Sequence, residues 1–149
     1  MSAAIARYRF PSLPRVAVAW LAEEFGADGV GMRRPSGAVL PYRMVGLVTG
    51  TEREDKTQRC GIVSVHTFAD SMDGADDESD LAHQRMVVMG PPLYGPQEIT
   101  ITLRDGTTQV VSPRSLVTKQ IPVWVDYEVD TIFRFVGRYE ICVPPLFNG

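Results

Sequence analysis

Two alternating segments near the C-terminus constrain the fold more than any other feature of the sequence. Apolar side chains stand at every second position from Ile121 to Val129, and the segment from Ile132 to Val143 also alternates, with Phe133, Phe135, Tyr139, Ile141 and Val143 on one face. Successive side chains of a β-strand point to opposite faces, so this period predicts two strands with one apolar face each. The opposite face of the second segment carries Arg134, Arg138 and Glu140. We therefore expect a sheet with one buried face and one face that meets solvent or a polar partner.

Further segments of the chain also favour β-structure. Runs rich in β-formers cover Arg43 to Thr49 and Gln58 to Phe68, and the polar stretch from Gly50 to Lys56 joins them as an exposed loop. A short strand is expected over 29–33. Asp105-Gly106 lies between the β-rich segments 99–103 and 109–111, and this pair is typical of tight hairpin turns.

Two segments have helical spacing instead. Apolar residues recur three or four positions apart from Pro14 to Phe25, with Ser12 before them as a cap and Gly26 after them as a stop. A second helix is expected over 75–89, because an acidic run ahead of an apolar periodic stretch suits a helix N-terminus. Gly90-Pro91-Pro92 would end it.

Helices separated from runs of strands indicate an α+β fold. We expect a mostly antiparallel sheet with strands of mixed length, packed by two helices, and an extra β-hairpin. A length of 149 residues fits one domain. The prediction is a single domain over 1–149, with an N-terminal arm at about 1–10 and a C-terminal tail at about 144–149.

The charge of the chain limits its partners. The formal net charge is −3, and no long basic stretch is present, so a stable grip on nucleic acid is not expected. A pore through which DNA slides needs no net positive charge. Charged residues make up 22% of the chain, a slightly low share that mildly favours a surface covered by partners.

The two cysteines, Cys60 and Cys142, are too few for a disulfide framework or a zinc site. We expect both to be reduced, small apolar strand residues of a protein in the cytoplasm. No apolar run in the sequence is long enough to cross a membrane, and residues 1–7 lack the pattern of a signal peptide.

No residues have the spacing of a catalytic site. His66 falls in a predicted strand and His83 in the second predicted helix, and Ser64 with His66 does not make a triad. Three carboxylates share one strand face: Asp126, Glu128 and Asp130. Two of them could serve as the acid pair of a hydrolase, but we prefer the interpretation that this face is solvated.

Metal and phosphate motifs are also missing. If a calcium loop began at Asp70, its third position would be Met72, and the final acid is absent. The segment 29–31 lacks the third glycine of a dinucleotide-binding loop, and no strand is followed by Gly-Lys-Ser/Thr. We therefore expect no enzyme activity, no metal and no cofactor.

Arg134 and Arg138 lie four residues apart on one strand face, with Val136 between them. Exposure of this strand face to solvent would explain why both residues are arginine. The alternative is a contact between subunits, with acids such as Asp126 or Glu128 of a neighbouring copy.

The order of elements resembles the tail terminator proteins of long-tailed, siphovirus-type phages. After a first helix, that family has a proline followed by a β-run and a glycine, here 40–46, then a polar hairpin loop, here 51–57. A long strand ending in an acidic turn follows, here 60–70, then an amphipathic helix, here about 75–89. The final strand alternates aromatic and aliphatic residues, here 134–141, while 99–118 departs from the pattern as an extra hairpin.

The resemblance implies a structural role in the phage neck. Tail terminators form a hexameric ring that caps the tail tube and joins it to the head-side connector. DNA would pass through the ring without being specifically bound, and the protein would belong to the virion, after assembly in the host cytoplasm. Candidate subunit or partner contacts are Glu52, Arg53, Glu54, Asp55, Lys56, Asp70, Asp73, Arg134 and Arg138.

Two alternatives remain open from the sequence. Head-completion or stopper proteins of the neck have a similar size and related architecture. A small-molecule binding domain outside phages would require a concave apolar pocket with converging polar groups.

Overall fold

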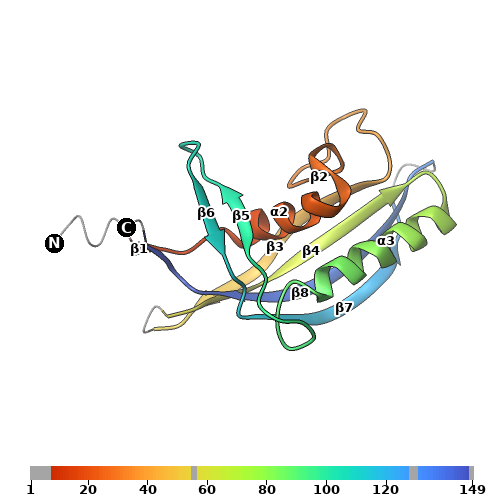
Figure 1. Cartoon of the computed structure of the whole chain (residues 1–149). Coiled ribbons are helices and arrows are strands. Elements are labelled where there is room, and N and C mark those ends of the chain that lie inside the picture. The colour runs from red at the N-terminus through yellow and green to blue at the C-terminus, as the bar shows by residue number, and fades with distance from the viewer. Residues whose placement is uncertain (1–7, 55–56, 128–130, 148–149) are drawn as a thin grey trace.

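A computed structural model of the chain describes residues 8–54, 57–127 and 131–147 (Figure 1). The helices are α2 (Leu13–Phe25), the short 3-10 helix η1 (Ala27–Gly29) and α3 (Met72–Val87). The strands are β1 (Tyr8–Arg9), β2 (Val30–Gly31), β3 (Tyr42–Glu52), β4 (Arg59–Ala69), β5 (Ile99–Thr102), β6 (Thr108–Val111), β7 (Ser115–Val125), β8 (Phe133–Val143) and β9 (Leu146–Phe147). None of the helices in this described part is long and apolar enough to cross a membrane.

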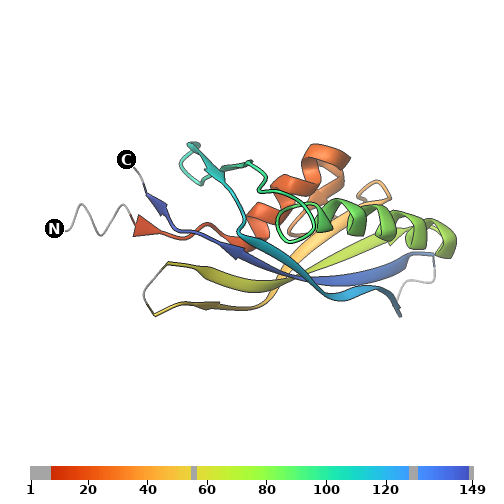
Figure 2. The same ribbon diagram turned by 60° about the horizontal axis from the view of Figure 1, so that its bottom comes forward.

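Five strands form the main sheet, in the order β2-β3-β4-β8-β7. Only β2 and β3 run parallel; the other neighbours are antiparallel. Both helices cover the same face: α2 packs on β3 and β4, and α3 packs on β4, β7 and β8 (Figures 1 and 2). The predicted α+β fold with a mostly antiparallel sheet is confirmed.

The core fills the space between the helices and the sheet. Apolar side chains with at most 1% exposure come from both layers and from the β5–β6 hairpin: Val16, Leu21, Met86, Ile99, Val111, Val45, Val63, Tyr139, Ile141 and Val143. The odd-numbered residues of β8 supply three of them, which confirms the alternation predicted for this strand.

The helices begin close to the predicted positions. The Oγ of Ser12 accepts a hydrogen bond from the N–H of Arg15 at 3.5 Å, and α2 starts one residue before the predicted Pro14. Helix α3 starts three residues earlier than predicted and ends at Val87 instead of Met89. The reason for the early start is Ser71, whose Oγ accepts from the N–H of Gly74 at 3.0 Å and caps the helix.

Strand β7 differs most from its prediction. It starts at Ser115 instead of Ile121 and ends at Val125, while residues 128 and 129 of the predicted strand lie outside the described part. The pairing with β8 is irregular between Thr118 and Val123, and it places Val123 opposite Val136, on the sheet face that the helices do not cover. Ile121 is 63% exposed, so the expectation that this apolar face is buried is wrong.

The N-terminal arm and the C-terminal tail pair with each other. Tyr8 lies opposite Phe147 and Arg9 opposite Leu146 in a two-stranded antiparallel sheet. Figure 2 shows this ribbon extending beyond the main body. The predicted hairpin is confirmed as β5–β6, with Gly106 at a φ of 88° in its turn, and Arg15 of α2 donates from Nη1 to the carbonyl of Thr102 at 2.9 Å.

Cys60 and Cys142 form a disulfide, so the expectation of two reduced cysteines is wrong. The antiparallel register of β4 and β8 places the two residues directly opposite each other, with their Cα atoms 4.1 Å apart. They are separated by 82 residues in the sequence. The cysteine count gave no sign of this register, because only the pairing of the two central strands brings the residues together.

Candidate functional site

The sheet face opposite the helices carries a group of polar and aromatic side chains from β4, β8 and the loops beside them. We call it the open sheet face. Even-numbered residues of β4 and β8 point to it, including Ser64, His66, Phe68, Arg134 and Arg138. The two strands lie side by side, so that Ser64 is opposite Arg138 and Phe68 is opposite Arg134. The predicted charged face of the last long strand is therefore part of this surface.

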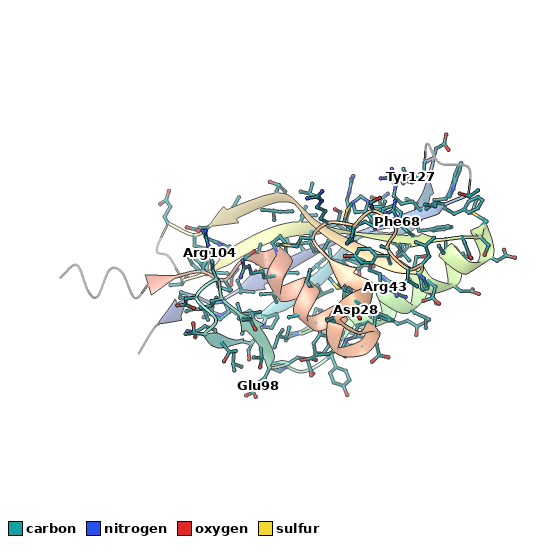
Figure 3. All side chains as sticks on the ribbon, turned by 90° about the horizontal axis from the view of Figure 1, so that it is seen from above. Asp28, Arg43, Phe68, Glu98, Arg104 and Tyr127 are labelled. Atoms are coloured by element: carbon teal, nitrogen blue, oxygen red, sulfur yellow. A yellow bond between two sulfur atoms is a disulfide. The ribbon has the colours of Figure 1, made fainter. Side chains whose placement is uncertain are left out.

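Aromatic and arginine side chains stack at one end of the open sheet face. Phe68 is buried, and the edge of the Tyr127 ring meets it with 5.5 Å between centroids. The guanidinium of Arg34 lies 5.2 Å from the Phe68 ring centre, and Arg134 lies 5.4 Å from that of Tyr127. Nη2 of Arg34 also donates to the Tyr127 hydroxyl at 3.4 Å. Figure 3 shows Phe68 and Tyr127 close together at the same end of the sheet.

The chain segment after β2 brings Arg34 to this position. The hydroxyl of Tyr42 donates to the carbonyl of Arg33 at 2.8 Å and ties the segment to the start of β3. Gly31 lies under the same hydroxyl, at a point where a Cβ atom would collide with it. The segment therefore wraps around the sheet edge and places a third arginine on the open sheet face, where Arg34 and Arg134 both contact Tyr127.

His66 lies on the open sheet face opposite Val136, the residue midway between Arg134 and Arg138 on β8. Its Nε2 and the Oγ of Ser64 are 3.0 Å apart, while its buried Nδ1 has no hydrogen-bond partner among the described residues. Burial lowers the pKa of His66 below 6.5, and the positive charges of Arg134 and Arg138 lower it further. The imidazole is therefore held neutral near pH 7. Among the described residues no carboxylate hydrogen-bonds to it, so the group that orients the histidine of a catalytic triad is missing from this part.

His83 lies on the helix side of the sheet and does not meet His66. Its Nδ1 is 2.8 Å from the hydroxyl of Tyr139, which is buried in the core. Burial raises the pKa of Tyr139, and the charge of Asp80 raises it further. This pair joins α3 to β8 and serves the packing of the two layers.

A buried ion pair connects β3 to α3. Arg43 is 2% exposed, forms an ion pair with Glu78 and places its guanidinium 3.7 Å from the centre of the Phe25 ring. Burial lowers the pKa of Arg43, and the contact with Glu78 opposes that shift. The pair lies beside a surface cavity of about 430 Å³ that Glu24 and Asp28 also line.

The residues predicted as contacts fall in three places. Glu52, Arg53 and Glu54 lie at the tip of the β3–β4 hairpin, where Glu52 forms an ion pair with Arg59 at 2.6 Å. Asp55 and Lys56 lie outside the described residues.

Asp70 and Asp73 lie at the opposite end of β4, about 30 Å from the hairpin tip by the rise of an 11-residue strand. Arg134 and Arg138 lie on the open sheet face. The structure therefore does not bring the two predicted loops together.

Sequence reasoning missed Arg34, Phe68 and Tyr127 as parts of one cluster. The alternation of the strand at 58–68 places Ser64, His66 and Phe68 on one face, which was a usable signal. The register against β8, and the return of Arg34 over the sheet edge, depend on tertiary packing that leaves no local pattern.

The larger cavities do not coincide with this cluster. One of about 650 Å³ lies between the start of α2 and the β3–β4 hairpin, lined by Leu13, Pro14, Leu47, Glu52 and Arg59 among others. Neither histidine lines any of the four cavities described for the structure. Within the described residues no group of three or more His, Cys, Asp or Glu side chains could hold a metal ion.

A comparison with protein-family models gives no match for this chain, and a comparison with curated proteins gives no significant match.

Proposed function

We propose that the chain is a structural subunit of a phage neck, and that it forms the tail terminator ring that caps the tail tube and joins it to the head-side connector. The observation that carries the proposal is the one-sided sheet. Both helices pack on one face, and the other face carries an arginine–aromatic cluster on which, in the described part, no helix or second sheet packs (Figure 2).

The edges of this sheet support an assembly role. Trp124 and Ile121 on the edge strand β7 are 50% and 63% exposed, and Leu47 on β3 is 55% exposed. β7 and β3 lie toward opposite edges of the sheet, and exposed large apolar side chains such as these are typical of surfaces that meet another protein. The pairing of β7 with β8 shifts register around Lys119 and again around Pro122, and a charged residue and a proline in an edge strand disfavour uncontrolled edge pairing.

The order of elements supports the named role. The chain has the elements of the tail terminator pattern in the same order. These are a helix, a hairpin with a polar tip, a long strand ending in an acidic turn, a second helix and a final alternating strand. In this proposal the copies form a closed, sixfold ring in the virion. The tail tube protein binds on one side and the connector on the other, and DNA passes through without specific contacts.

Size-exclusion chromatography with light scattering, followed by negative-stain microscopy, tests the proposal. The expected result is a ring of uniform mass that binds one end of purified tail tubes and stops their growth. A ring that binds the connector but not the tube would instead indicate a head-completion protein. A strictly monomeric protein at high concentration that also leaves tube growth unchanged would contradict both roles.

A further inference from the structure

The two layers of the molecule carry opposite charge on their outer surfaces. On the open sheet face, Arg34 and Arg134 stack on Phe68 and Tyr127, and Arg138 lies four residues further along β8, opposite Ser64; we call these three arginines the basic patch. Among the described residues, none of the three forms an ion pair. Nε of Arg134 is buried without a hydrogen-bond partner, and Arg138 is exposed. The patch therefore holds positive charge that the described chain does not neutralise by contact.

The outer surface of α3 is acidic. Ala75, Ser79, Ala82 and Met86 face the core, so residues on the opposite side of the helix face outward.

Asp73, Asp77 and Asp80 occupy that side at spacings of four and three residues, and all three are exposed; we call them the acidic stripe. None of them forms an ion pair in the described part of the chain. Oδ2 of Asp80 accepts a hydrogen bond from Nε2 of Gln84 at 2.8 Å.

The basic patch and the acidic stripe cannot meet within one molecule. Helix α3 packs on β4 and β8 from one side of the sheet, and the basic patch lies on the other side of the same two strands (Figures 1 and 2). The two surfaces can meet between two copies when the open sheet face of one copy lies against helix α3 of the next. Such a contact uses two different surfaces of the same chain, and repeated contacts of this kind close into a ring when the rotation per copy permits it.

We propose that the basic patch of one copy docks on the acidic stripe of a second copy, and that this contact joins neighbouring subunits. The inference rests on the ring assembly of the proposed function and names its interface. It names Asp77 and Asp80 as partners of the patch in place of Asp126 of a neighbouring copy; within one copy, the backbone carbonyl of Asp126 accepts from Nη2 of Arg134 at 3.5 Å. The chain supplies both halves of the contact, which favours a second copy over nucleic acid as the occupant of the patch.

Reciprocal charge reversal tests the contact. The first variant is R134E/R138E, the second is D77R/D80R, and the third carries all four changes. A matched control, R104E, reverses an exposed arginine near the tip of the β5–β6 hairpin, away from both surfaces (Figure 3). Sedimentation velocity over a concentration series measures self-association, and circular dichroism with thermal unfolding establishes that each variant is folded. R138E alone, at an exposed position, serves if the double change unfolds the protein.

We expect each reversed surface alone to weaken self-association by at least about tenfold, because like charges then face each other. An equimolar mixture of the first two variants is expected to assemble into rings in which the two variants alternate, since every patch then meets a stripe of opposite charge. The fourfold variant is expected to recover ring formation. Rising salt should weaken the wild-type contact, because exposed charges are screened.

The outcomes separate this inference from the proposed function. Rings that form equally well in all variants would overturn the interface and leave the tail role standing. Charge-dependent rings that neither bind tail tubes nor stop their growth would retain the interface and reject the tail role. If R138E weakens binding of a fluorescent DNA duplex while self-association is unchanged, the patch is a nucleic-acid surface and the inference is wrong.

Discussion

The imidazole Nδ1 of His83 lies 2.8 Å from the hydroxyl oxygen of Tyr139, and this contact joins helix α3 to the central strand β8. Tyr139 is 1% exposed, so its hydroxyl depends on His83 for a partner. We expect Tyr139→Phe to lower the free energy of unfolding by about 1 kcal/mol, since the ring still fills the core but the hydrogen bond is lost. Urea denaturation measures the change. Tyr94→Phe, at a residue that is 58% exposed, is the control and should have no effect.

Because Tyr139 is buried, we also expect the protein to lose stability at alkaline pH. Burial raises the pKa of Tyr139 above its ordinary value of 10.0. Above pH 10 the unfolded chain therefore releases this proton while the folded chain keeps it, so the free energy of unfolding falls as the pH rises. Denaturation at pH 9 to 11 should show the decline in the wild type and a smaller decline in Tyr139→Phe. An identical slope in both proteins would contradict the assignment.

The pKa of His66 reports the positive charge on the open sheet face. Burial, Arg134 and Arg138 all lower its pKa below 6.5, so the folded protein resists protonation of this ring and loses stability as the pH falls below that value. Replacing Arg138 with Gln should raise the pKa of His66, because one repelling charge is removed. NMR titration of the imidazole signals, assigned with a His83→Gln variant, measures it. Arg104→Gln should leave the titration unchanged.

The disulfide between Cys60 and Cys142 predicts sensitivity to reductant. It joins the two central strands across 82 residues of sequence, so it restricts the unfolded chain strongly. Reduction, or the change of both cysteines to Ala, should lower the free energy of unfolding by about 2–4 kcal/mol. Thiol titration of the unfolded, unreduced protein should detect no free thiol. Two free thiols there would show that the cysteines are unpaired in solution.

The sequence predicted the elements better than their partners. Alternation identified the buried face of 133–143, and Ser12, Gly26 and Asp105-Gly106 located a helix and a turn, because these signals act over a few residues. The disulfide and the pairing of β1 with β9 join residues far apart in the chain, and no local pattern encodes them.

On the open sheet face, too, local features could be predicted from the sequence and long-range contacts could not. The charged side of β8 was visible from the spacing of Arg134 and Arg138. The stacking of Tyr127 and Arg34 on Phe68 was not, because it depends on the register of β4 against β8 and on the return of the 31–34 segment over the sheet edge.

Gly61 controls how closely the β3–β4 hairpin approaches α2. A Cβ atom at this position would lie 2.5 Å from Cδ1 of Leu13 and 2.7 Å from the carbonyl oxygen of Thr49, and backbone atoms cannot yield as a flexible side chain can. We therefore expect Gly61→Ala to lower the free energy of unfolding by about 1–3 kcal/mol through overpacking. Chemical denaturation measures it. Gly95→Ala is the matched control, because nothing lies within 4 Å of its added Cβ atom. Equal stability of the two variants would mean that the hairpin moves away from α2 at little cost in free energy. The cavity between the hairpin and α2 would then have a different size in solution.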